Sequence, residues 1–127
     1  MASSGTILLI DSDINQTLSI CRALERQMYT VYTAADYHEA RRTIHEAKPD
    51  IIVMETVLPD GDGFTFCKEI QGQTSAYIFF LTHKADCEDA KLGFNSGGDM
   101  YLTKPFHMPE LMARVEAAMW RRRKAFA

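Results

Sequence analysis

The stretch KPDIIVMETVLPDGDG, residues 48–63, decides how the rest of the chain is organised. Its centre, residues 51–54, is a continuous apolar run with β-branched side chains, which is typical of a strand buried on both faces of a parallel sheet. The run ends on a carboxylate, Glu55, and the Pro, Gly and Asp residues that follow predict a turn. Because ligands of open parallel sheets bind outside the carboxyl ends of the strands, Glu55 is predicted to point into a functional crevice.

Short apolar strands alternate with amphipathic helices on both sides of this stretch. The patterns predict strands over residues 6–10, 29–34, 50–54, 76–81 and 99–103. They predict helices over residues 14–28, 37–47, 62–71, 86–96 and about 109–124, with Asp13 and Asp36 as N-caps. In the first helix, helical spacing places six residues near one face, namely Ile14, Leu18, Cys21, Leu24, Gln27 and Met28. This alternation predicts an α/β fold with a five-stranded, doubly wound parallel sheet.

The 127 residues are predicted to form one domain over residues 6–124. Residues 1–5 are expected to be a disordered start or a cloning remnant, and residues 125–127 a tail that starts a linker to an effector domain. The net charge of −3 argues against direct nucleic-acid binding by this domain. The basic run WRRRK, residues 120–124, suits the C-terminus of a helix.

Three cysteines without metal-ligand spacing predict buried or half-buried free thiols in a reducing cytosol. No apolar run approaches the about 20 residues of a membrane span, and no signal peptide is visible. We therefore expect a cytoplasmic protein.

Polar side chains follow four of the predicted strands. They are Asp11, Ser12 and Asp13, then Glu55, then Thr82, then Lys104. Because parallel strands place their carboxyl ends at one edge, these residues are expected to form one acidic pocket with a hydroxyl and an ammonium group. Its carboxylates suit Mg²⁺, and its cation and hydroxyl suit phosphoryl oxygens. The alternative is an ion-paired cluster without chemistry; four matching strand ends favour a functional site.

Five motifs, in this order and spacing, resemble the receiver domain of bacterial two-component response regulators over essentially the whole chain. They are ILLID at 7–11, PDIIVM at 49–54, LPDGDG at 58–63, FLT at 80–82 and YLTKPF at 101–106. The last helix makes the chain most similar to receivers of winged-helix transcription regulators. The resemblance implies a flavodoxin-like (βα)5 fold. It also implies Mg²⁺-dependent phosphoryl transfer from a histidine kinase to an aspartate after the third strand.

The resemblance places the phosphoacceptor at Glu55 and the matching hydroxyl and amine at Thr82 and Lys104, with Thr82 and Tyr101 as the switch pair. It assigns Mg²⁺ ligands to Asp11, Glu55 and the backbone carbonyl of Val57. Ser12 replaces an acid of the family, so Mg²⁺ binding is expected to be weak or absent. The extra methylene of Glu55 moves its carboxylate by about 1.5 Å, enough to disturb in-line attack. We therefore expect a receiver impaired in phosphorylation.

Three interpretations of Glu55 remain open. Its carboxylate imitates part of an aspartyl phosphate, or it pairs with Lys104 in an inert module, or it is an engineered change in a working receiver. The first two have about equal weight, and Ser12 argues against the third.

The resemblance further implies signalling through the face of the fourth helix, fifth strand and fifth helix. There, cross-dimer ion pairs of a homodimer would come from Lys91, Asp99, Glu110 and Arg114; a solvated surface is the alternative. Implied partners are a sensor histidine kinase, unless that pairing has been lost, and a C-terminal DNA-binding effector domain. The domain is expected not to be an enzyme. The alternative functions are a working Mg²⁺-dependent phosphoacceptor receiver and a small phosphohydrolase.

Overall fold

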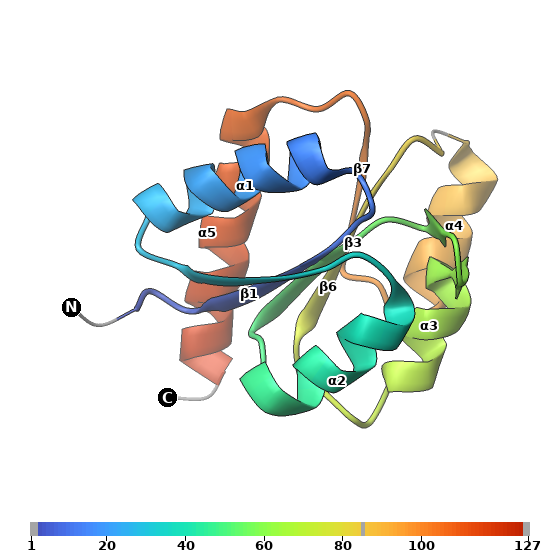
Figure 1. Cartoon of the computed structure of the whole chain (residues 1–127), viewed down its shortest axis with the longest axis horizontal. Coiled ribbons are helices and arrows are strands. Elements are labelled where there is room, and N and C mark those ends of the chain that lie inside the picture. The colour runs from blue at the N-terminus through green and yellow to red at the C-terminus, as the bar shows by residue number, and fades with distance from the viewer. Residues whose placement is uncertain (1–2, 85, 126–127) are drawn as a thin grey trace.

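The computed structural model describes residues 3–84 and 86–125 and contains a five-stranded parallel sheet between two layers of helices (Figure 1). Its strands lie in the order β2-β1-β3-β6-β7. Their bounds are β1 (Thr6–Ile10), β2 (Thr30–Ala34), β3 (Ile51–Met54), β6 (Tyr77–Thr82) and β7 (Met100–Thr103). The helices are α1 (Ile14–Arg26), α2 (Tyr37–Ala47), α3 (Gly63–Ile70), α4 (Cys87–Asn95) and α5 (Met108–Ala125). The predicted fold class is confirmed.

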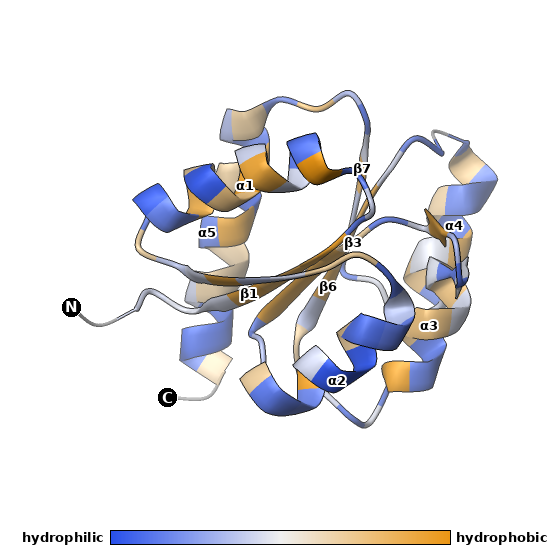
Figure 2. Cartoon of the chain, in the orientation of Figure 1, coloured by the Kyte–Doolittle hydropathy of each residue, from blue (hydrophilic) through white to orange (hydrophobic). Residues whose placement is uncertain are grey.

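Two hydrophobic cores lie on opposite faces of the sheet. Side chains alternate along each strand, so in β1 Leu8 and Ile10 face one core while Ile7 and Leu9 face the other. The first core is closed by α2 and α3, and the second by α1 and α5. Figure 2 shows the apolar strands in the centre and the mixed faces of the helices around them. Burial on both faces explains why residues 51–54 are uniformly apolar.

The register brings the carboxyl ends of the central strands to one edge. Ile10 lies opposite Met54, and Met54 lies opposite Phe80. Thr82 lies opposite Thr103 at the end of the next pair. The residues that follow these positions therefore meet at a single edge of the sheet.

The turn predicted after Glu55 is a small antiparallel hairpin of β4 (Val57–Leu58) and β5 (Gly61–Asp62). At its tip, the Asp60 carboxylate accepts hydrogen bonds from the N–H groups of Tyr37 (3.1 Å) and His38 (2.9 Å) at the start of α2. Asp36 caps the same helix through the N–H of Glu39, as predicted. The hairpin is therefore fastened to α2.

Two sequence predictions about α1 are wrong. The helix ends at Arg26 rather than at residue 28, because Met28 has a positive φ of 70°. Ile14 is 73% exposed and Leu18 is 47% exposed, because the helix turns Ile20 and Leu24 toward the sheet instead. The predicted N-cap is confirmed, since the Asp13 carboxylate accepts from the N–H of Gln16.

The expectation of buried or half-buried free thiols holds for Cys67, which is buried, and for Cys21, which is half-buried, but it is wrong for the exposed Cys87. Cys87 is exposed because it begins α4, a helix that buries Gly93 alone among its residues. None of the helices in the described part of the chain is long and apolar enough to cross a membrane.

The ends of the chain differ in part from the expected tails. Ser4, expected in a disordered start, donates its N–H to the carbonyl of Met28 (2.8 Å). Ala125 is the last residue of α5. Residues 1–2 and 126–127 lie outside the described residues.

Candidate functional site

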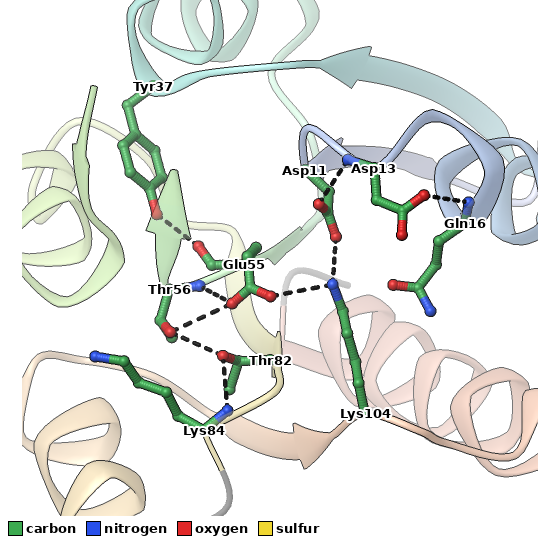
Figure 3. Close-up of polar contacts among 9 residues, drawn as sticks. All are labelled: Asp11, Asp13, Gln16, Tyr37, Glu55, Thr56, Thr82, Lys84 and Lys104. Atoms are coloured by element: carbon green, nitrogen blue, oxygen red, sulfur yellow. Dashed lines mark hydrogen bonds and ion pairs between the residues drawn. The ribbon is translucent and has the colours of Figure 1, made fainter. Parts of the chain in front are cut away.

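The pocket at the carboxyl edge of the sheet gathers side chains from four strand ends (Figure 3). Asp11 follows β1, Glu55 follows β3, Thr82 ends β6 and Lys104 follows β7. Backbone hydrogen bonds hold these ends together. The Glu55 N–H donates to the carbonyl of Ile10 (3.0 Å), and the Lys104 N–H donates to the backbone carbonyl of Thr82 (2.7 Å). The structure therefore brings these four residues together, as the sequence predicts.

The Lys104 ammonium lies between two carboxylates. Its Nζ is 2.6 Å from Asp11 Oδ2 and 3.1 Å from Glu55 Oε1. The side chains are 3% exposed for Lys104, 9% for Glu55 and 15% for Asp11, so water screens these contacts weakly. One buried cation therefore binds both acids of the pocket.

The surroundings favour the charged forms of this pair. Burial opposes ionisation of Glu55, but the neighbouring Thr82 hydroxyl, Lys104 and the Thr56 N–H outweigh it and lower the pKa of the Glu55 carboxyl. Burial likewise opposes the charge on Lys104, but Asp11 and Glu55 outweigh it and raise the pKa of the ammonium. The ion pair is therefore present throughout the neutral pH range.

The second oxygen of Glu55 is bound by Thr56, a residue that the sequence analysis did not single out. Glu55 Oε2 lies 2.5 Å from Thr56 N and 3.3 Å from Thr56 Oγ1. Thr56 Oγ1 in turn lies 2.8 Å from Thr82 Oγ1. A hydroxyl directly after the carboxylate that ends a buried strand was the available signal. Thr56 therefore joins the acid to the hydroxyl of the next strand.

The predicted switch residues Thr82 and Tyr101 are connected through Lys84. The Lys84 N–H donates to Thr82 Oγ1 (3.2 Å), and the Tyr101 hydroxyl donates to the Lys84 carbonyl (2.7 Å). Burial, with the nearby carboxylates Asp89, Glu55 and Asp86, raises the pKa of Tyr101 to about 12. The Tyr101 hydroxyl, on β7, therefore stays neutral and donates a hydrogen bond to the loop that follows β6.

Tyr37 fixes the backbone of the pocket, and the sequence did not identify it as a site residue. Its hydroxyl donates to the Glu55 carbonyl (2.5 Å), and its ring stacks on Phe66 at 4.8 Å between centroids. Burial and the nearby carboxylates Asp62, Glu55, Asp60 and Asp11 raise the pKa of this hydroxyl well above its ordinary value. The buried aromatic residue thus stabilises the turn that carries Glu55.

The residues assigned to Mg²⁺ fit the ion poorly. Asp11 and Glu55 both contact Lys104, while the Asp13 carboxylate caps α1 and so cannot replace the acid missing at Ser12. Ser12 and the Val57 side chain are exposed. Over residues 3–84 and 86–125, no group of three or more His, Cys, Asp or Glu side chains could hold a metal. Carboxylate oxygens are the ligands that Mg²⁺ requires, and here an ammonium shares both.

The four residues expected at a dimer interface are exposed on α4, before β7 and on α5. Lys91 pairs with Glu88 (3.4 Å) and Arg114 with Glu110 (3.7 Å), each within one helix. The Asp99 carboxylate accepts from the N–H of Ile78 (2.8 Å). These contacts lie within one chain, and the dimer stays a prediction.

The family model for the response regulator receiver domain matches residues 7–116. The chain belongs to this family. The resemblance noted in the sequence is thereby confirmed at the level of the receiver domain, and the five-stranded fold is that of a flavodoxin-like receiver.

This receiver is similar to two curated regulators. It is 39% identical over 116 residues to the alkaline phosphatase synthesis transcriptional regulatory protein PhoP of Bacillus subtilis, covering 91% of the chain and 48% of that protein. It is 34% identical over 123 residues to the probable transcriptional regulator ycf27 of Guillardia theta, covering 94% and 47%. The chain thus spans about half the length of these relatives.

Among solved structures, the receiver superposes on a two-component response regulator from Clostridium difficile with a TM-score of 0.90 and 35% identity. The match covers 92% of this chain and 97% of that one. The family match and this structural similarity together identify the chain as a receiver module of a two-component response regulator.

Proposed function

We propose that this receiver signals without stable phosphorylation at Glu55, its output state being set by the bond between Glu55 and Lys104. The observation that carries the proposal is the position of Lys104 Nζ, within hydrogen-bond distance of both Asp11 and Glu55. Attack on a phosphodonor needs a free carboxylate oxygen aimed in line. One oxygen of Glu55 faces Lys104 and the other faces Thr56.

The proposal lies between the two main interpretations of Glu55. A carboxylate carries one negative charge where a phosphoryl group carries nearly two, so full imitation is unfavourable. A purely inert ion pair would engage Lys104 alone, whereas Glu55 is also linked to Thr82 through Thr56. The proposed state is therefore a permanent, partial version of the phosphorylated pocket.

The proposed partners follow from the relatives and from the exposed face. Two relatives are named as transcriptional regulators, which supports control of transcription through a DNA-binding effector region. The proposed output surface is formed by α4, β7 and α5, with a homodimer joined through Lys91, Asp99, Glu110 and Arg114. Exposed ion pairs each stabilise such a dimer by about 0–1 kcal/mol, so they would mainly set its register. A sensor histidine kinase is the proposed ancestral partner.

Intact-mass spectrometry after incubation with Mg²⁺ and acetyl phosphate tests the proposal. The native chain is expected to gain no phosphoryl group, whereas Glu55→Asp, which shortens the side chain by one methylene, is expected to gain one. The double variant Ser12→Asp with Glu55→Asp restores the missing acid and is expected to be labelled faster. Glu46→Asp, an exposed position on α2, is the matched control and should stay unlabelled.

Labelling of the native chain at Glu55 would overturn the proposal and favour a working Mg²⁺-dependent phosphoacceptor. Failure of the double variant to gain mass would contradict silencing at these two positions. Hydrolytic turnover of the donor by the native chain would favour the phosphohydrolase alternative.

A further inference from the structure

Thr56 is fully buried, and its hydroxyl lies between two functional side chains of the pocket (Figure 3). Its Oγ1 is 3.3 Å from Glu55 Oε2 and 2.8 Å from Thr82 Oγ1. Among the described residues, the Thr82 hydroxyl bonds Thr56 and the N–H of Lys84, and it is also close enough to Glu55 to help lower the pKa of that carboxyl. The hydroxyl of Thr56 is therefore within reach of both the acid of β3 and the hydroxyl of β6.

The donors along this chain of contacts have a defined direction. The Lys84 N–H can only donate, so Thr82 accepts from it. Glu55 is ionised and can only accept, so Thr56 donates its proton to the carboxylate. The Thr56 oxygen is then free to accept from Thr82, and in this arrangement each hydroxyl donates once and accepts once. Hydrogen bonds aligned in this way strengthen one another in a buried site.

The chain of contacts ends at Tyr101. The Lys84 carbonyl accepts the Tyr101 hydroxyl at 2.7 Å, so the same loop residue bonds Thr82 through its N–H and Tyr101 through its carbonyl. A change in how Thr82 holds Lys84 therefore reaches the aromatic ring on β7. The charge of Glu55 orients the hydroxyl protons at the other end.

We infer that Thr56 is a positioning residue whose hydroxyl connects the Glu55 carboxylate to Thr82, Lys84 and Tyr101. The inference rests on the proposed function, because it takes Glu55 as a permanent carboxylate. It gives this chain an internal connection between the acceptor position and the output face that needs no bound group.

Solution NMR on the whole chain, without phosphodonor or metal, tests the inference through two variants. Thr56→Val removes the hydroxyl at nearly constant volume, and Thr56→Ser keeps it. In Thr56→Val, the Thr82 hydroxyl loses its hydrogen bond to Thr56, so its own bond to the Lys84 N–H is expected to weaken. Exchange of the Lys84 amide should then become up to about tenfold faster, the size of effect expected for one hydrogen bond. Thr56→Ser should retain the native rate. Thr43→Val, which removes a hydroxyl bonded within α2, is the matched control.

The coupling itself is measured by adding Glu55→Gln to each background. The substitution is expected to move the Tyr101 ring resonances in the native and Thr56→Ser backgrounds, and to move them much less with Thr56→Val. A through-space effect of the Glu55 charge would be equal in all backgrounds.

Equal shifts of the Tyr101 resonances in all backgrounds would overturn the inference. It would also be overturned if Thr56→Ser were as disturbed as Thr56→Val, because side-chain volume and not the hydroxyl would then matter. These measurements use no phosphodonor. Their failure is therefore separate from labelling of Glu55, which would overturn the proposed function alone.

Discussion

At the scale of single residues, Lys104 controls the charge balance of the pocket. Its ammonium is nearly inaccessible to water and lies against Asp11 and Glu55. Removing one member of a buried ion pair leaves the others desolvated without compensation. The pocket therefore depends on the cation more than a surface ion pair would.

The pH dependence of this cluster follows from its shifted pKa values. The pKa of Glu55 is lowered, so its contribution to stability is present above about pH 4.3 and is lost as the pH falls through the folded-state value. The pKa of Lys104 is raised, so its contribution is present below about pH 10.4 and is lost as the pH rises through the folded-state value. The native pair should stabilise the fold across the neutral range.

Lys104→Met is predicted to lower the free energy of unfolding by about 3–5 kcal/mol at pH 7. In this variant the two carboxylates lie near each other without a cation, and the Glu55 carboxyl loses a neighbour that lowers its pKa, so the folded state takes up a proton in mild acid. The loss should therefore shrink as the pH falls toward about 4, where the Glu55 carboxyl of the variant becomes protonated. Urea denaturation at several pH values measures it, with exposed Lys91→Met as the control. An equal loss of unfolding free energy at pH 7 and at about pH 4 would contradict this account.

At the scale of elements, the hairpin β4–β5 and helix α2 support the turn that carries Glu55. Asp60 at the hairpin tip accepts from two N–H groups of the first turn of α2. The same turn begins with Tyr37, whose hydroxyl holds the Glu55 carbonyl. Desolvation opposes ionisation of the exposed Asp60, but the N–H groups of Tyr37 and His38 outweigh it and lower the pKa of this carboxyl. The hairpin therefore supplies a second carboxylate acceptor at the N-terminus of α2, beside the N-cap Asp36.

Asp60→Ala is predicted to lower the free energy of unfolding by about 1 kcal/mol, the usual cost of a lost N-cap acceptor. Asp60→Asn keeps an oxygen acceptor and should lose less. Chemical denaturation measures both, with Glu46→Ala on the exposed face of α2 as control. If Asp60→Ala equals the control, the hairpin does not stabilise the helix.

The elements also show where local patterns were sufficient. The predicted bounds of most strands and helices differ from the observed ones by one or two residues, because apolar periodicity and N-cap carboxylates are local signals. For α1 the periodicity was ambiguous, since Ile14 and Leu18 also lie at helical spacing yet face water. Only packing against β1 and β3 selected the face with Ile20 and Leu24.

At the scale of the whole molecule, the two ends of the parallel strands have different roles. The carboxyl ends carry the pocket, while at the amino ends Arg122 fastens the last turn of α5 to the sheet. Its guanidinium contacts Asp50 (2.8 Å) and the carbonyl of Ser75 (2.6 Å), and Asp50 also accepts from the N–H of Thr6. The basic run that suited a helix end therefore joins α5 to the sheet through Arg122.

The two cores predict an order of thiol reactivity. Cys87 is exposed and should react rapidly with a thiol reagent in the native state. Cys67 is buried, and burial raises the pKa of its thiol, so it should react only when the molecule unfolds. Mass spectrometry of timed labelling measures the order, and Cys87→Ser should abolish the fast phase. Rapid labelling of Cys67 would contradict the packing of α3 on the sheet.

The sequence by itself determined the alternating α/β fold and the composition of the pocket. Both follow from local rules, namely the apolar period of each element and the polar residue at the end of each buried strand. Only the tertiary structure decided how those residues are paired. Lys104 meets Glu55 49 positions away and Asp11 93 positions away. Thr56, Tyr37 and Asp60 acquired their contacts in the same way, because such distances depend on strand register and helix packing, which no short stretch of sequence contains.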